Sequence, residues 1–278
     1  MARVRVVTDS TADLDRGTAA LHGIEVVPIY VRWGSHVFRD GVDLTPSQFY
    51  RRLVRIKSHP ATAQPSPDDF ARVYASVNEA VEIVSIHISS KISGTFNAAR
   101  LGADMVRPDT RVEVVDSGLN SSGLAMVALA AARVAGEGGS VEDVAAEARR
   151  ACAETRMMGL FDTMKYLARG GRISPAIALA AGFMHAKPAL TFRDGEIVRA
   201  GLVRSRDAGM RRLLKFVTDM GPLRSIIVSH STDKDELQQF LSRLKDVYTG
   251  EVDRVLEMGA ALGVHGGPGM IIVACRRS

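Results

Sequence analysis

Short runs of apolar, mostly β-branched residues alternate with segments of helical periodicity through the first half of the chain. Continuous apolar runs are typical of strands buried on both faces of a parallel sheet. Strands that alternate with helices predict an α/β fold, in which helices flank a mostly parallel sheet. The predicted strands are residues 4–7, 24–31, 82–88 and 111–115.

Several helices of the first half have clear sequence signals. Thr45 and Ser66 offer N-cap hydroxyls, and each precedes a proline at the first helical position. Gln48 and Asp69 follow at the capping-box position. Two Ala-rich helices are predicted over residues 122–134 and 141–155.

The second half has a different pattern. Residues 190–192 and 197–203 flank an Asp194-Gly195 pair, which predicts a β-hairpin. Helix, strand, helix and two closing strands follow, at residues 213–217, 225–229, 237–247, 252–258 and 270–274. We therefore expect an α+β C-terminal domain, with the chain divided into residues 1–157 and 158–278.

Composition narrows the class of protein. The chain has 278 residues, of which 46% are hydrophobic, so it can bury a core without disulfides or metals. Cys152 and Cys275 lie far apart in sequence and predict reduced, buried thiols. The longest apolar stretches are about half the roughly 18–20 residues of a membrane span, and no targeting segment is visible. We expect a cytoplasmic protein without stable membrane insertion.

The charge is mild. Thirty-six Lys and Arg against 31 Asp and Glu leave a net charge of +5. A nucleic-acid-binding surface would need a basic stripe with interleaved aromatic residues, and the chain has one Trp and five Tyr. The sequence predicts no nucleic-acid partner.

Hydroxyl residues follow several predicted strands. The clusters are Thr8 to Thr11, Ser89 to Thr95, Asp116-Ser117 and Ser229 to Thr232. In an open parallel sheet, the carboxyl ends of the strands and the helix N-termini meet at one crevice, which suits an anionic head group. The same residues are ordinary N-caps, so capping and binding both stay open for each cluster. Gly94, beside Ser93, would let a ligand approach the backbone closely.

Two glycine-rich segments also stand out. Gly170-Gly171 can end a helix before a new start at Ser174-Pro175, and Arg172 between them can bind an anion. Residues 263–269 predict a loop in which four glycines surround His265. A histidine on a loop is often a plain surface residue, so a functional and a structural role both stay open.

Common catalytic signatures are missing. The sequence contains no GxxxxGK[ST] phosphate loop, no GxSxG elbow and no HExxH pair. We therefore predict no metal and no bound cofactor.

Several short motifs occur in a specific order along almost the whole chain. They are Val7 to Leu14, Asp40 to Leu44, Thr62 to Pro67, Ser89 to Phe96, Val115 to Ser117, Leu167 to Ile173, Lys187-Pro188 and Gly263 to Gly269. Together they resemble the DegV family, also called the fatty-acid-binding (FakB) subunits of the bacterial fatty acid kinase system.

The resemblance implies two domains with one long-chain fatty acid buried between them. Thr62 and Ser93 would bind the carboxylate, with Gly94 and Thr95 as the supporting loop. A separate kinase subunit would bind ATP and convert the lipid to an acyl phosphate. This chain would then be a carrier and not an enzyme. Ala63 departs from the family pattern, where serine is common.

The resemblance further implies that Arg172 and His265 serve docking of that kinase or phosphoryl transfer. Helical residues 177–184 could line a lipid tunnel or simply pack in the core. One alternative is a stand-alone phosphotransferase or hydrolase that uses Ser93 and His265. A DNA-binding regulator is a further alternative, although no helix-turn-helix is recognisable.

Overall fold

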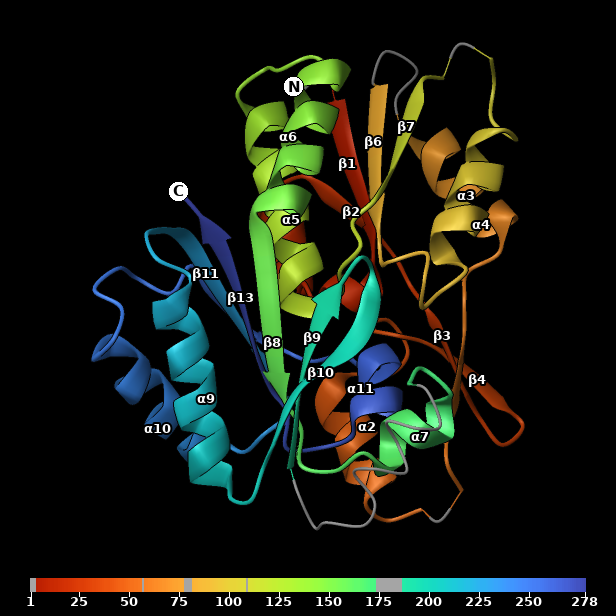
Figure 1. Cartoon of the computed structure of the whole chain (residues 1–278). Helices are drawn as coiled ribbons and strands as arrows, with labels where there is room; N and C mark the ends of the chain where they lie inside the picture. Colours follow the sequence, from red (N-terminus) through yellow and green to blue (C-terminus); the bar gives the residue numbers. More distant parts are fainter. Residues whose placement is uncertain (1–3, 57, 78–81, 109, 174–186) are drawn as a thin grey trace.

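The computed structural model describes residues 4–56, 58–77, 82–108, 110–173 and 187–278. The chain forms two main sheets and a small third one, and a pair of helices lies between the main sheets (Figure 1). Residues 174–186 carry the predicted Ser174-Pro175 helix start and the predicted tunnel helix, and both predictions lie outside the described residues. No helix in the described ranges is both long and apolar enough to cross a membrane.

The N-terminal sheet confirms the predicted parallel arrangement. Its strands are β1 (Val4–Asp9), β2 (Ile24–Val27), β6 (Glu82–His87) and β7 (Val112–Asp116), and they lie in the order β2-β1-β6-β7 with every pair parallel. Helices α3 (Pro67–Ser76) and α4 (Thr95–Ala103) pack on one face, where they share a core with Val7 and Ile83. Helices α5 (Ser121–Gly136) and α6 (Val141–Glu154) cover the opposite face (Figure 1).

Capping explains where several helices begin. Both predicted capping boxes are present, Thr45 with Gln48 at α2 (Pro46–Leu53) and Ser66 with Asp69 at α3. A third box joins Ser140 and the first turn of α6. Such boxes depend on residues three positions apart, so the sequence alone determines them.

The single strand predicted over residues 24–31 is wrong. The segment is two strands in two sheets, because β2 ends at Val27 and β3 (Tyr30–Trp33) joins a small antiparallel sheet with β4 (His36–Arg39) and β5 (Ala61–Ala63). Pro28 between them has no N–H for a sheet hydrogen bond. The next N–H, of Ile29, donates to Ser10 Oγ at 3.0 Å and not to a strand.

The C-terminal sheet is mixed. Its order is β10-β9-β8-β13-β11-β12, and of the described pairs in this sheet only β11–β12 is parallel. The strands are β8 (Thr155–Leu160), β9 (Lys187–Arg193), β10 (Glu196–Val203), β11 (Leu223–His230), β12 (Arg254–Glu257) and β13 (Ile271–Arg277). The predicted hairpin is β9–β10, whose turn holds Asp194 at φ 51° and Gly195 at φ 80°. The expected division between residues 157 and 158 falls inside β8 and stays a prediction.

Each face of the C-terminal sheet has its own core. Helices α9 (Arg206–Asp219) and α10 (Lys234–Lys245) cover one face. Helix α5 contacts β13 on the other face and also β1 of the N-terminal sheet, so one helix packs against both sheets. A buried ion pair from Arg276 of β13 to Glu147 of α6, with an N–O distance of 2.8 Å, joins the same layers.

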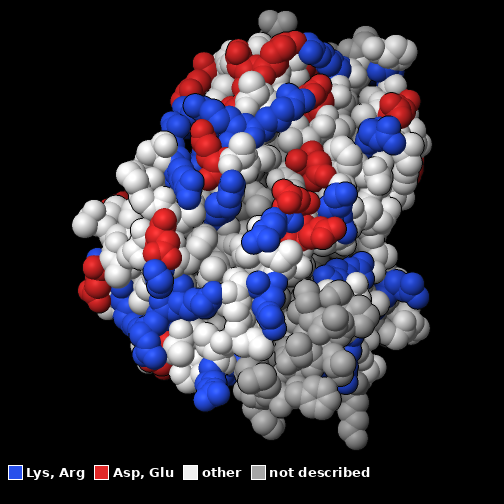
Figure 2. All heavy atoms as spheres, viewed as in Figure 1, with Lys and Arg blue, Asp and Glu red and all other residues white. Residues whose placement is uncertain are grey.

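Three short helices complete the region below the sheets in Figure 1: α2, α7 (Lys165–Gly170) and α11 (Ala260–Gly266). The remaining described helices are the 3-10 turn η1 (Ser10–Ala12) and α1 (Arg16–Leu21). Acidic and basic side chains are interspersed over much of the face in Figure 2.

Candidate functional site

A cavity lies between the two halves of the molecule, beyond the carboxyl ends of β1 and β6. It contains about 940 Å³ of space free of atoms, part of it open to solvent. The space inside it that water-sized spheres can enter is smaller, about 110 Å³. The wall is mainly apolar, with Ile29, Ile88, Ile92, Met157, Phe161, Leu167, Leu190, Phe192, Ile197, Met258, Ala261, Leu262, Met270 and Ile272.

Predicted site residues from distant parts of the sequence share this cavity. Thr62 comes from β5, Ser93 and Gly94 from the loop between β6 and α4, Arg172 from the segment after α7, and His265 from α11. These five are predicted site residues, and the structure brings all of them to one cavity. Thr95, the sixth, is fully buried behind Ser93 and does not line it.

Thr62 and His265 are in direct contact. Thr62 Oγ1 lies 2.9 Å from His265 Nε2, although 203 positions separate them in sequence. Burial, together with the smaller effects of the charges of Arg172 and His59, lowers the pKa of His265 to about 4. The imidazole is therefore neutral near pH 7. Its Nδ1 is buried without a hydrogen-bond partner among the described residues.

Ser93 is held by its neighbours in the loop. Its Oγ lies 2.8 Å from Thr95 Oγ1 and accepts from Thr95 N at 3.3 Å. Gly94 packs so closely on Gln64 that a Cβ at this position would overlap the Gln64 side chain. The predicted close approach at Gly94 is thus made by a protein side chain that itself lines the cavity.

Arg172 follows a left-handed glycine. Gly171 ends α7 at φ 68°, which confirms the predicted glycine C-cap. The guanidinium of Arg172 donates to Gly170 O at 2.6 Å, and the residue is exposed at the cavity. A cation in this place can attract an anionic group at the polar part of the cavity.

The loop predicted over residues 263–269 is wrong in its first half. His265 lies in the last turn of α11, which extends to Gly266. Gly263 allows this helix to pack on α2, because a Cβ there would overlap the Phe49 ring. The glycines therefore serve close packing, and the helix aims His265 at Thr62.

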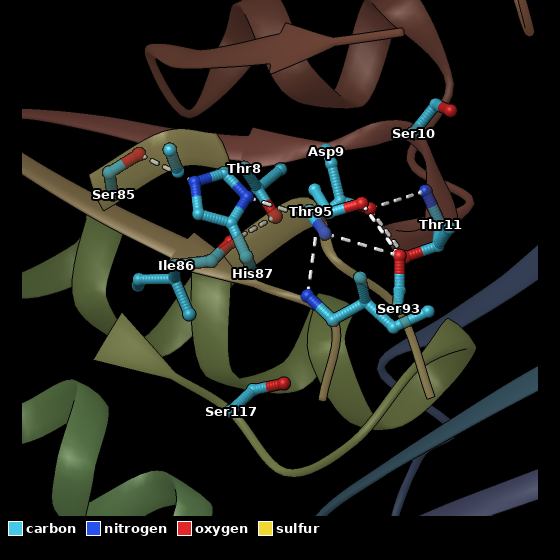
Figure 3. A network of polar contacts seen from close by, with 12 residues as sticks. Thr8, Asp9, Ser10, Thr11, Ser85, Ile86, His87, Ser93, Thr95 and Ser117 are labelled. Atoms are coloured by element: carbon cyan, nitrogen blue, oxygen red, sulfur yellow. Dashed lines mark hydrogen bonds and ion pairs between the residues drawn. The ribbon is translucent and has the colours of Figure 1, made fainter. Parts of the chain in front are cut away.

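A buried polar network supports the loops of the site (Figure 3). His87 Nδ1 lies 3.0 Å from Asp9 Oδ2, and its Nε2 lies 2.7 Å from Ser85 Oγ. This spacing resembles a Ser-His-Asp triad, but all three side chains are fully buried and none lines the cavity. Asp9 also accepts from the N–H and hydroxyl of Thr11, at 3.0 and 2.5 Å. The network holds the ends of β1 and β6 beside Ser93 and Thr95 (Figure 3).

The other hydroxyl clusters differ in their placement. Thr11 lines the cavity, whereas Ser117 and the cluster from Ser229 to Thr232 do not. The sequence interpretation missed Gln64 and Asn120, which also line it. Asn120 immediately precedes α5. Its position after a strand and before a helix is the sequence signal that could have identified it as a site residue.

The alternative that pairs Ser93 with His265 as nucleophile and base finds no support in the hydrogen bonds. His265 contacts Thr62 and Ser93 contacts Thr95. Among the described residues, no group of three or more His, Cys, Asp or Glu side chains could hold a metal ion.

These features define a class: an α/β protein built on two main sheets, with a mainly apolar cavity between its halves that several hydroxyl groups also line. The chain belongs to the DegV family. The family model, described as "uncharacterised protein, DegV family", matches residues 3–277. A DegV domain-containing protein of Streptomyces coelicolor is 35% identical over 273 residues, with 96% of each chain covered. One from Caldanaerobacter subterraneus subsp. tengcongensis is 32% identical over 276 residues, also with 96% of each covered.

Solved structures of similar proteins support the same assignment. A DegV family protein from Thermus thermophilus, described by its fatty acid binding, is 34% identical with a TM-score of 0.88, covering 99% of this chain and 100% of that one. A stearic-acid-binding protein from Eubacterium ventriosum is 27% identical with a TM-score of 0.91, covering 99% and 98%. DegV of Bacillus subtilis, described as a fatty acid binding protein, is 27% identical with a TM-score of 0.88 and full coverage of both chains.

Proposed function

We propose that this protein binds one long-chain fatty acid in the cavity and presents its carboxylate to a separate ATP-dependent kinase, which converts it to an acyl phosphate. The observation that carries the proposal is the cavity itself, a mainly apolar chamber that Thr62, Ser93 and His265 also line. Fatty acid binding by similar proteins that cover the whole chain supports it.

Hydroxyl donors suit a buried carboxylate that must later react. Thr62 and Ser93 can each donate one hydrogen bond to a carboxylate oxygen. The neutral His265 ring can donate to Thr62 Oγ1 through Nε2, which leaves the threonine hydrogen for the lipid. Two hydroxyl groups satisfy part of the hydrogen-bonding capacity of the carboxylate, and no salt bridge is formed. One oxygen therefore stays available for phosphorylation.

The apolar wall supplies most of the affinity in this proposal. Each buried methylene contributes about 0.8 kcal/mol. A chain of about fourteen methylenes gains on the order of 11 kcal/mol before the losses of translational and conformational freedom are subtracted. The hydrogen bonds then fix which end of the lipid faces Arg172.

Arg172 is the proposed residue for the later step. Its guanidinium is exposed at the cavity and can pair with phosphate oxygens as the acyl phosphate forms. In this proposal the kinase subunit holds ATP, and this chain carries substrate and product without catalysing the reaction itself. The proposal places the chain in the cytoplasm, where ATP is available.

Lipid binding is tested by extraction of the purified protein, mass spectrometry and titration with palmitic acid. We expect a bound long-chain fatty acid in the wild type. Thr62→Ala and Ser93→Ala should each weaken palmitate binding by about tenfold, which corresponds to one lost hydrogen bond to a charged group. A matched control is Thr191→Ala, because Thr191 lines the cavity but donates its hydroxyl to Met157 O. Full palmitate affinity in the double variant of Thr62 and Ser93 would contradict the head-group assignment.

The kinase step needs a separate assay. With a fatty acid kinase catalytic subunit and ATP, Arg172→Ala should retain palmitate and lose most acyl phosphate formation. Arg133→Ala is the control, since Arg133 is an arginine on α5 that pairs with Glu137 and does not line the cavity. A wild-type rate of acyl phosphate formation in Arg172→Ala would refute the proposed role.

A further inference from the structure

Helix α11 carries His265. The N-terminus of this helix is held in place by contacts with distant parts of the chain. It has only seven residues and begins after Gly259, which has no side chain to cap it. Helices this short are marginal on their own, so tertiary contacts must hold them in place. Two aspartates from the N-terminal half provide the missing acceptors.

Asp13 and Asp40 bind the first N–H groups of this helix. Asp13 Oδ1 accepts from Gly259 N at 2.8 Å, and Asp40 Oδ1 accepts from Ala260 N at 2.8 Å. Both carboxyl groups are buried, with 7% and 3% of the residue exposed. The contacts span 246 and 220 positions of sequence, so they join the two halves of the chain.

The second oxygen of each aspartate is also fixed. Ser121 Oγ donates to Asp13 Oδ2 at 2.6 Å, and Ser10 Oγ donates to Asp40 Oδ2 at 2.8 Å. Asp13 and Ser121 have φ values of 55° and 46°, in the left-handed region that non-glycine residues rarely adopt. Neither carboxyl group can rotate without losing a hydrogen bond at both oxygens.

Gly259 makes the double contact possible. A Cβ at this position would lie 3.0 Å from Asp40 Oδ2 and 3.4 Å from Asp13 Oδ1. The space between the two carboxyl groups therefore accommodates the backbone of Gly259 but has little room for a side chain. A shift of either aspartate would move the helix as a body.

The other end of the same helix carries the contact to the head-group site. His265 lies in the last turn, 2.9 Å from Thr62. Close packing of Gly263 on Phe49 and of Gly170 on the His265 ring restricts the helix from two further sides. A displacement at Gly259 is thus transmitted through two turns of helix to the His265–Thr62 contact.

We propose that Asp13 and Asp40 are positioning residues, which hold α11 at the register that places His265 on Thr62 and so set the affinity for the carboxylate. This inference rests on the proposed function only for its last step. The contact between His265 and Thr62 belongs to the protein without lipid and is measurable there.

The test compares Asp40→Ala and Asp13→Ala with Asp143→Ala. Asp143 is the matched control, because it accepts from Ser140 N and Ser140 Oγ at the start of α6, away from α11. One readout is the nitrogen NMR signals of the His265 ring in the lipid-free protein, and the other is palmitate affinity. We expect the α11 variants to shift the His265 signals and to weaken palmitate binding by about tenfold, while Asp143→Ala changes neither.

Two milder sets of variants keep the test decisive. Asp40→Asn retains an acceptor for Ala260 N and should restore most of the affinity and the His265 signals. Ser10→Ala and Ser121→Ala each remove one donor and should shift the His265 signals in the same direction by less, which covers the case that an alanine at 13 or 40 prevents folding. Unchanged His265 signals in a folded Asp40→Ala protein, or in the Ser10 and Ser121 double variant, would overturn the inference. Absence of palmitate binding by the wild type would instead refute the proposed function.

Discussion

At the scale of single residues, the buried carboxylate of Asp9 organises the ends of two strands. It accepts from Ile88 N at 3.0 Å, from His87 Nδ1 and from both donors of Thr11. Ile88 begins the loop that carries Ser93. The Asp9 carboxylate therefore acts on the site through backbone position and touches no ligand.

Asp9→Asn should be destabilising. An amide nitrogen in place of one oxygen would face a donor, and a buried hydrogen bond to a charged group contributes about 1.5–3 kcal/mol. We expect urea unfolding to show a loss of about 2 kcal/mol or more. Ser85→Ala should leave palmitate binding unchanged, because Ser85 does not line the cavity. Undiminished stability of Asp9→Asn would contradict the structural role.

At the scale of elements, local sequence patterns determine where some helices and strands begin, and tertiary contacts determine others. The capping boxes at Thr45 and Ser66 involve residues three apart, so the helix starts were predictable. The break at Pro28 depends on Ser10, and α11 depends on Asp13 and Asp40, all distant in sequence. No short pattern contains such partners, and both elements were predicted wrongly.

The site, too, was predictable from the sequence in part and depends on tertiary contacts for the rest. Motif resemblance placed Thr62, Ser93, Arg172 and His265 together as candidates, and the cavity brings them together. The direct contact of His265 with Thr62 requires packing between α11 and β5, and this packing could not be predicted from the sequence. Gln64 and Asn120 were not predicted as site residues, because the sequence around each is typical of an ordinary loop or cap residue.

The β9–β10 hairpin gives an element-scale prediction. Ser89 Oγ donates to Gly195 O at 2.7 Å, and Phe192 and Ile197 of the hairpin line the cavity. A Cβ on Gly195 would lie 2.7 Å from Ser89 Oγ. Gly195→Ala should therefore weaken both stability and palmitate binding.

Gly34→Ala is the matched control for this prediction. Gly34 has φ 63° and no atom within 4 Å of its would-be Cβ, so it isolates backbone strain of about 1–2 kcal/mol. Urea unfolding should show a larger loss for Gly195→Ala than for Gly34→Ala, and only the former should lose palmitate affinity. Equal stability and equal affinity in the two variants would argue against the contact between hairpin and loop.

At the scale of the whole molecule, titratable groups lie where the two halves meet. Burial raises the pKa of Asp13 to about 8 and that of Asp40 to about 6, against hydrogen bonds that lower them. A raised carboxyl pKa means that the folded state keeps a proton that the unfolded state releases near pH 4. The associated stability is present at low pH and is lost as the pH rises through the folded pKa.

The free energy of unfolding should therefore fall between pH 6.5 and 8, by up to about 1.4 kcal/mol per pH unit. His265 does not oppose this trend there, because its lowered pKa makes the free energy of unfolding rise with pH only between about 4 and its usual value near 6.5. Asp13→Asn should flatten the fall while keeping an acceptor for Gly259 N. Parallel stability curves of the variant and the wild type in urea, over this pH range, would contradict the assignment.

The central claim is that a fatty acid occupies the cavity with its carboxylate at Thr62 and Ser93. A crystal structure of the protein saturated with palmitic acid tests it most directly. The account predicts continuous, elongated electron density along the apolar wall that ends within hydrogen-bond distance of Thr62 Oγ1 and Ser93 Oγ. A cavity without lipid density at saturating palmitate, or a carboxylate bound elsewhere, would contradict it.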